Sequence, residues 1–284
     1  MSNRSDILVS PELLREWGLP DPGESKKSRG QVVVVGGSRR SPGAVFLAGE
    51  AALRVGAGRL AVVVPASIEG QLGVVMPEAA VHSLPDQADA PLDEGPRDAV
   101  ESADAVLVGP GFDDPDETRH TLRAVSRLEV RCLILDAFAL GILPTIDRGE
   151  LPTNLILNPN REEAAILLGW DPADGQDPDL GEIARRYDAV VNCYGHVVTP
   201  AGESWRVPAG GPGLGTSGSG DVLAGAITGF AARGVGPARA AVWGSWAHAR
   251  AGDRLTGLAG IGFLARDIPP ELTRAIAEVI APPG

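Results

Sequence analysis

The chain has few aromatic residues, few cysteines and little positive charge. Phe, Trp and Tyr make up only 4% of its 284 residues, so a core must be built mainly from Ala, Val, Leu and Ile. Its two cysteines, Cys132 and Cys193, lie in apolar, strand-like runs and are too few for a disulfide framework or a zinc site. We expect buried free thiols, with a single disulfide as the alternative. The formal net charge of −12 argues against a nucleic-acid or anionic-membrane surface.

Long apolar runs are lacking too. No run approaches the roughly 20 residues that a membrane helix requires. The N-terminal residues 1–6 lack the apolar core of a signal peptide. We therefore expect a cytoplasmic protein without a membrane segment. The acidic balance still allows a local pocket for phosphates, because net charge describes the whole surface.

Short β-branched runs alternate with helical patterns along the chain. Residues 1–30 are predicted to form a polar N-terminal arm, and residues 31–284 a single domain. The expected strands cover residues 31–35, 60–64, 105–108, 132–135, 154–157, 189–192, 197–199 and 205–207. The expected helices cover residues 44–56, 116–127, 161–169, 180–187, 221–233, 237–255 and 269–280. This alternation predicts an α/β fold with a mainly parallel sheet covered on both faces, and a hairpin around Pro200–Gly202 near one edge.

The most informative segment is Gly210–Asp221, in which six of twelve residues are glycine. Such a segment is a loop, because glycine loses unusual backbone freedom when it is ordered. The apolar positions from Val222 onward follow helical spacing, so the loop leads into a buried helix. The first N–H groups of a helix lack partners and bind anions. Asp221 at that position is suited to take a proton from a hydroxyl that attacks a phosphate, and its alternative role is a helix cap.

Other candidate residues follow the predicted strands. In a parallel sheet the ligand lies beyond the carboxyl ends of the strands. Those ends carry Gly36–Gly37, Gly109–Gly111, Asp136 and Asn158–Asn160, so one crevice is expected to collect them beside the glycine-rich loop. Asp136 is interpreted either as a Mg²⁺-side carboxylate or as the start of a turn. Glu163 is either a Mg²⁺-side carboxylate or a partner of a helix dipole.

Two further signals are weak. Gly213–Gly218 has the G-x-G-x-x-G spacing of dinucleotide-binding folds, but it falls late in the chain and no strand is predicted after it. The four histidines, His82, His120, His196 and His248, have no metal-ligand spacing and are expected to be mostly structural or solvated.

In combination, the motifs resemble those of the ADP/ATP-dependent NAD(P)H-hydrate dehydratases, a family of the ribokinase-like superfamily. The matching segments run in order: Val35–Ser38 with Pro42–Ala44, Ala52–Gly58, Gly109–Gly111, Asn158–Pro159 with Glu163, Gly218–Gly225, His248–Asp253 and Gly262–Asp267. Gly-Ser-Gly-Asp alone would indicate only the superfamily. The early glycine-bearing segments narrow the resemblance to this family.

The resemblance implies a ribokinase-like three-layer α/β/α sandwich and an enzyme that repairs hydrated NADH or NADPH. In this family the terminal phosphate of ADP or ATP passes to the ring hydroxyl of the hydrate, and elimination of phosphate restores the dihydronicotinamide. The implied site has Asp221 as catalytic base and an anion hole formed by Gly218, Ser219 and Gly220. The adenine nucleotide is expected at Asn192, Cys193, Tyr194, Gly195, His196 and Gly220, the hydrate at Ala44, Gly111, Asn160 and Asp221, and Mg²⁺ beside Glu163.

Three positions depart from the family pattern. Phe138 stands where an Asp is usual, Asn160 where a His is usual, and Asn192 where a Lys is usual. Asn forms hydrogen bonds but supplies no charge. Two alternatives stay open: a kinase of the same superfamily that phosphorylates a vitamin or sugar hydroxyl, and a nucleotide-binding homologue without turnover. Self-association is expected from the family alone, and the nucleotide and hydrate preferences are left undecided.

Overall fold

The structure, a computed structural model, describes residues 6–87, 89–171, 173 and 177–281. The strands are β1 (Ile7–Leu8), β2 (Gln31–Val35), β3 (Arg59–Val64), β4 (Ala79–Ser83), β5 (Ala105–Val108), β6 (Leu133–Leu135), β7 (Leu155–Leu157), β8 (Val190–Cys193), β9 (His196–Val198) and β10 (Ser204–Arg206). The α-helices are α1 (Pro11–Trp17), α2 (Gly43–Arg54), α3 (Ala66–Val75), α4 (Glu94–Ser102), α5 (Pro115–Ser126), α6 (Phe138–Ile142), α7 (Arg161–Leu168), α8 (Leu180–Tyr187), α9 (Ser219–Ala232), α10 (Pro237–Ala259) and α11 (Ile268–Ile280).

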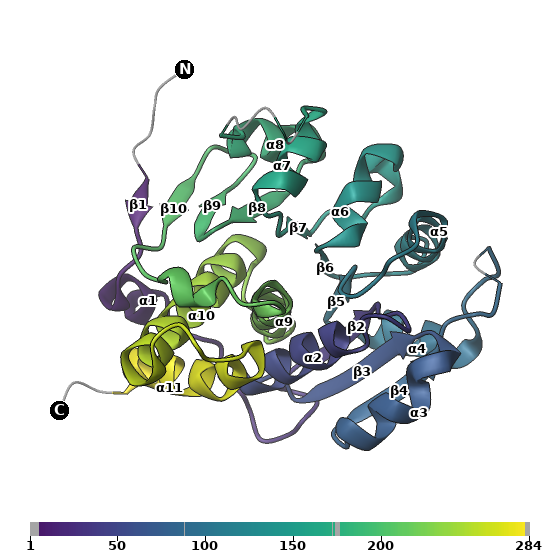
Figure 1. Cartoon of the computed structure of the whole chain (residues 1–284), viewed down its shortest axis with the longest axis horizontal. Coiled ribbons are helices and arrows are strands. Elements are labelled where there is room, and N and C mark those ends of the chain that lie inside the picture. The colour runs from purple at the N-terminus through teal and green to yellow at the C-terminus, as the bar shows by residue number, and fades with distance from the viewer. Residues whose placement is uncertain (1–5, 88, 172, 174–176, 282–284) are drawn as a thin grey trace.

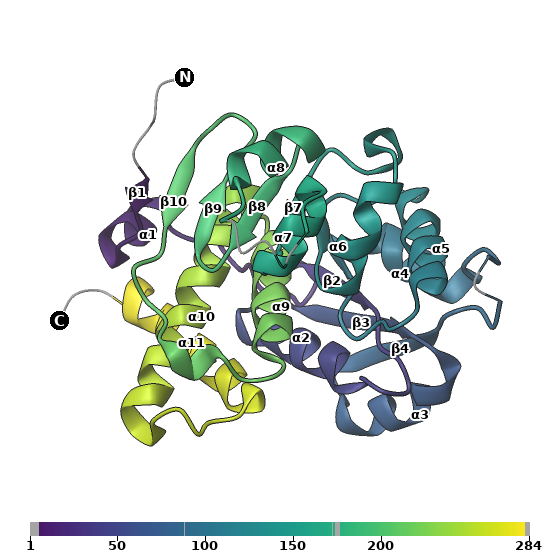
Figure 2. The same ribbon diagram turned by 45° about the horizontal axis from the view of Figure 1, so that its top comes forward.

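All ten strands belong to one sheet, in the order β1-β10-β9-β8-β7-β6-β5-β2-β3-β4 (Figures 1 and 2). Neighbouring strands are parallel except at β10–β9 and β9–β8. The predicted parallel sheet and the hairpin near one edge are therefore confirmed. The chain runs from β2 outward through β3 and β4, and then returns to place β5 on the other side of β2. The strand order thus reverses between β2 and β5, where α/β folds bind ligands at the strand ends.

The sheet separates two helical layers. In β2, Val32 and Val34 pack against one layer, and Val33 and Val35 against the other. The first layer contains α1, α2, α3, α9, α10 and α11, and the second contains α4 to α8. Strands buried on both faces read as continuous apolar runs, which explains why β2, β3 and β5 were predictable. The expected three-layer α/β/α sandwich is confirmed.

Part of the predicted N-terminal arm is integrated into the domain. Strand β1 pairs with β10, with Ile7 opposite Trp205, and Leu14 of α1 is fully buried. The rings of Trp17 and Trp205 meet edge to face with their centroids 6.1 Å apart. Apolar side chains in an otherwise polar segment thus find a face of the domain to cover. Residues 1–5 of the arm lie outside the described residues.

Helix α9 packs unusually close to α2. A Cβ added at Gly225 would lie 2.0 Å from the carbonyl oxygen of Ala48, and one added at Gly229 would lie 2.6 Å from that of Ala52. Only glycine permits this approach, because it has no side chain. Helix α9 also contacts β5 and β2, so it lies against the sheet at the point where the strand order reverses. The helix begins at Ser219, two residues earlier than expected from the sequence.

Candidate functional site

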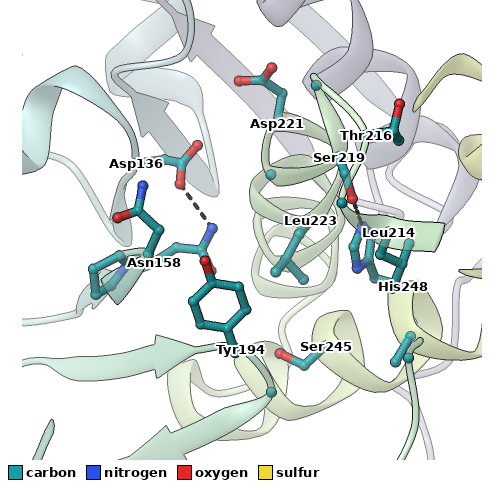
Figure 3. A pocket seen from close by; sticks show the side chains of 18 of the residues that line it. Asp136, Asn158, Tyr194, Leu214, Thr216, Ser219, Asp221, Leu223, Ser245 and His248 are labelled. Carbon is teal, nitrogen blue, oxygen red and sulfur yellow. Dashed lines mark hydrogen bonds between the residues drawn. The ribbon is translucent and has the colours of Figure 1, made fainter. Parts of the chain in front are cut away.

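A cavity of about 670 Å³ lies at the carboxyl ends of β6, β7 and β8, beside the first turn of α9 (Figure 3). Asp136 lines it after β6, Asn158–Asn160 after β7, and Tyr194 after β8. The glycine-rich loop and residues of α10 form the facing wall. Its volume lies within the usual range of small-molecule sites. Most of the elements that the sequence predicted to form one crevice therefore meet here.

Asp221 lies in the first turn of α9 and faces the cavity (Figure 3). It does not cap the helix: the cap position is Gly218, and no side chain makes a capping hydrogen bond there. Burial raises the pKa of Asp221 from 3.8 to about 6. A carboxylate whose pKa is near neutrality is well matched to accept a proton from a substrate hydroxyl.

The backbone before Asp221 brings free N–H groups to the cavity. Gly218 has a φ of +92°, and a Cβ there would lie 2.5 Å from Cδ1 of Leu47, so glycine is required. The N–H of Ser219 donates to the carbonyl oxygen of Thr216 at 3.1 Å. Within the described part of the chain, the N–H groups of Gly218 and Gly220 have no such protein partner. Of the three predicted anion-hole residues, these two therefore offer free donors.

His248 anchors the end of the glycine-rich loop that leads into α9. Its Nε2 lies 3.0 Å from Oγ of Ser219, and burial lowers the pKa of His248 to about 4, so the ring is neutral. Five residues further on, Oδ1 of Asp253 accepts a hydrogen bond from the N–H of Gly210 at 3.2 Å. Two residues of α10 thus anchor both ends of the loop. From the sequence alone His248 has no predicted site role, and its only signal is its place in the His248–Asp253 motif.

A buried chain of hydrogen bonds ends at Asp136. The hydroxyl of Ser245 donates to Oδ1 of Asn192 at 2.8 Å. Nδ2 of Asn192 donates to Oδ1 of Asn158 at 2.7 Å, and Nδ2 of Asn158 donates to Oδ1 of Asp136 at 2.9 Å. All four residues are at most 6% exposed. We call this chain the amide relay. Each donor points toward Asp136, an alignment that strengthens successive hydrogen bonds.

The cavity carries three carboxyl groups and, among its described lining residues, no Lys or Arg. Burial first, and then the charges of Asp221 and Glu163, hold the pKa of Asp136 well above its usual value. Burial raises the pKa of Glu163 to about 7. Glu163 also forms a capping box with Asn160, accepting from its backbone N–H at 2.8 Å through Oε2. This arrangement supports the dipole-partner interpretation of Glu163 and leaves its second oxygen available.

No group of three or more Asp, Glu, His and Cys side chains close enough to hold a metal by themselves occurs in the described part of the chain. Mg²⁺ is commonly held by one or two carboxylates together with waters and substrate phosphates. The carboxyl groups of the cavity fit that kind of site.

Several predicted site residues lie apart from the cavity lining. Ala44, in the first turn of α2, and Gly111, three residues after β5, are neighbours, since a Cβ added at Gly111 would lie 3.0 Å from that of Ala44. Cys193 is buried and, like Cys132, a free thiol as expected. His196 lies on β9, with its Nε2 2.9 Å from Oγ of Ser204. Of the predicted nucleotide segment, the structure brings Tyr194 and Gly195 to the cavity.

The fold is that of the ribokinase-like superfamily. A ribokinase-like superfamily protein from Enterococcus faecalis V583 superposes with a TM-score of 0.83 and 24% identity, over 99% of this chain and 100% of that protein. The ADP/ATP-dependent NAD(P)H-hydrate dehydratase of Bacillus subtilis, co-crystallised with ATP/Mg²⁺, superposes with a TM-score of 0.80 and 24% identity, over 96% of this chain and 99% of that protein. In the described residues, no helix combines the length and apolar character needed to cross a membrane.

Among proteins with this fold, the chain belongs to the NAD(P)H-hydrate dehydratase family, whose model matches residues 32–274. It is 43% identical over 274 residues to an ADP-dependent (S)-NAD(P)H-hydrate dehydratase of Xanthomonas campestris pv. campestris, covering 93% of this chain and 94% of the relative. A bifunctional NAD(P)H-hydrate repair enzyme of Moorella thermoacetica is 35% identical over 79% of this chain. The chain spans 44% of that longer relative.

Proposed function

We propose that this chain dehydrates the hydrated forms of NADH and NADPH and consumes ADP or ATP in doing so. The observation that carries the proposal is Asp221, a carboxylate with a pKa raised to about 6, next to free backbone donors at a helix start inside a cavity. The Xanthomonas relative is named for an ADP-dependent reaction on the (S) hydrate. We therefore propose ADP and the (S) hydrate as the pair to test first.

In the proposed reaction, Asp221 accepts the proton of the ring hydroxyl as that oxygen attacks the terminal phosphorus of the nucleotide. The bond from this phosphorus to the bridging oxygen breaks, and the shortened nucleotide leaves, AMP from ADP or ADP from ATP. The N–H groups of Gly218 and Gly220 donate to the phosphoryl oxygens, where negative charge is concentrated in the transition state. In the second stage the ring carbon–oxygen bond breaks, phosphate leaves with the bonding electrons, and the adjacent ring carbon loses a proton to water. The carbon–carbon double bond of the dihydronicotinamide is thereby restored.

The described lining of the cavity holds three carboxyl groups and no Lys or Arg, so in their ionised form these groups would repel a nucleotide polyphosphate. A divalent cation removes this conflict, and we propose that Glu163 and Asp136 hold Mg²⁺ together with the nucleotide. When bound, Mg²⁺ neutralises charge on the phosphates. The same cation favours the ionised form of Glu163, whose pKa is otherwise about 7.

The remaining assignments complete the proposal. Ala44 and Gly111 are proposed to contact the hydrate beyond the cavity, because they meet at the reversal of the strand order. Residues 31–284 are proposed to form one catalytic domain. A cytoplasmic location is proposed on the two buried free thiols, which suit a reducing compartment. Self-association is proposed from the family resemblance alone.

The variant Asp221→Asn tests the catalytic assignment. It keeps the size of the side chain and removes the proton acceptor, so turnover of hydrate should be lost. ADP affinity, measured by calorimetry, should stay within about tenfold, because the group acts mainly in the transition state. Turnover at the wild-type rate in Asp221→Asn would refute the role of Asp221 as base.

A further inference from the structure

Tyr194 has a backbone conformation that its residue type does not favour. It forms with Gly195 the two-residue turn between β8 and β9, and the flanking residues Cys193 and His196 are paired. Both turn residues have positive φ, +49° for Tyr194 and +73° for Gly195. This is the pattern of a type I′ turn, in which Asn-Gly is the preferred pair. A tyrosine at the first position lowers stability, so we expect a contact or a function that accounts for this residue.

Burial of the Tyr194 ring does not account for this residue. The residue is 72% exposed, and its hydroxyl has no hydrogen-bond partner among the described residues. Three residues other than glycine have positive φ in the described chain: Ala137, Asp188 and Tyr194. Asp188 ends α8, whereas Ala137 and Tyr194 both line the cavity. Strained backbone that gathers at a cavity is a sign of function.

The surroundings of the ring indicate what it binds. The guanidinium of Arg161 lies over one face of the ring, 5.9 Å from its centroid. An exposed aromatic ring at the edge of a cavity is a platform on which a flat heterocycle stacks (Figure 3). Leu214 and Leu223 add apolar surface elsewhere in the same cavity, while the free donors of the phosphate site lie at its α9 end.

We propose that Tyr194 is the stacking platform for the base of the nucleotide co-substrate and sets the preference for nucleotides over simple polyphosphates. This inference deepens the proposed function and rests on it. In the complex, the stacking of the base on the exposed ring offsets the conformational cost of the strained turn. The phosphate site at the start of α9 does not depend on Tyr194.

The test compares two probes on the full chain, both with Mg²⁺: ADP and inorganic pyrophosphate. In Tyr194→Gly the Kd for ADP should rise about 5- to 150-fold, the range expected for one lost base–aromatic stack. The Kd for pyrophosphate should stay unchanged. Because glycine relieves the turn, Tm without ligand should rise by about 2 to 4 °C. Tyr194→Phe keeps the ring and should keep the affinity for ADP.

Asp188→Gly is the matched control, because it relieves a positive φ of 43° away from the cavity. It also removes an exposed ion pair with Arg148, which contributes little to stability. It should therefore raise Tm without changing the affinity for ADP. Unchanged ADP affinity in Tyr194→Gly, an equal loss for both probes, or a lower Tm would each overturn the proposal. Binding is measured without the hydrate, so the outcome is separate from that of the proposed reaction. A chain that stacks ADP on Tyr194 but restores no NADH would refute only the proposed function.

Discussion

Acidification should inactivate the enzyme far above the pH at which an ordinary aspartate is protonated. Burial raises the pKa of Asp221 from 3.8 to about 6, and the base must be ionised to accept a proton. With a pKa of 6, about nine tenths of the molecules are ionised at pH 7 and about one tenth at pH 5. We therefore expect kcat/KM, measured at saturating Mg²⁺ so that the proposed ligand Glu163 stays ionised, to fall about tenfold between pH 7 and pH 5. With a pKa of 3.8 the change over this interval would be negligible.

The assay is kcat/KM for the limiting nucleotide, measured from pH 5 to 8 in brief reactions, since the pH dependence of kcat/KM reports groups of the free enzyme. Carboxyl ¹³C shifts of the ligand-free chain give the same pKa directly, with Asp221→Asn to assign the signal. Glu163→Gln is the control, because Glu163 has a pKa of about 7 and lines the same cavity. The fall in kcat/KM centred near pH 6 should persist in Glu163→Gln. A flat profile down to pH 5, or a descent that vanishes in Glu163→Gln, would refute the reasoning.

Three further predictions concern stability and binding. Gly225→Ala should lower the free energy of unfolding, measured in urea, by about 1–3 kcal/mol, because the new Cβ forces α9 away from α2. Gly257→Ala, whose new Cβ has no atom within 4 Å, should raise the free energy of unfolding by roughly 0.5–1 kcal/mol. Asp136 ionises unfavourably in the fold, so the stability it contributes is lost as pH rises above 3.8 through its raised pKa. Asp136→Asn should therefore raise Tm at pH 8 but not at pH 4; an equal gain at both would contradict this. Replacing Mg²⁺ by EDTA should weaken ADP binding by about tenfold or more, and unchanged affinity would exclude the proposed cation.

The sequence predicted those elements whose burial produces an apolar pattern in consecutive residues. Strands β2, β3 and β5 are apolar at nearly every position, because both faces of the sheet are covered. The edge strand β4 is only half-buried and has no such pattern, so it was missed. Helix α3 was missed as well, since its Gly70 and Gly73 weaken a helical pattern.

In the site, likewise, the features contained in one segment could be predicted, and those that join distant segments could not. Asp221 and its loop stand in one segment, where glycine content and helical spacing reveal their chemistry. The amide relay joins residues 22, 34 and 53 positions apart, and it exists only because β6, β7 and β8 lie side by side. The family resemblance implied Asn192 as a nucleotide contact. In the structure Asn192 is 0% exposed and donates a hydrogen bond to Asn158, which in turn donates to Asp136. Its replacement of the usual Lys has a structural account in this chain.

The most direct test of the account is the recovery of dihydronicotinamide absorbance from hydrated NADH and NADPH, with Mg²⁺ and either ADP or ATP. We predict that absorbance returns only when nucleotide is present, that one phosphate is released for each dihydronicotinamide restored, and that Asp221→Asn abolishes both. No recovery from a chain that still binds ADP would contradict the proposed dehydratase. It would instead favour a kinase with another hydroxyl substrate or a nucleotide-binding homologue without turnover.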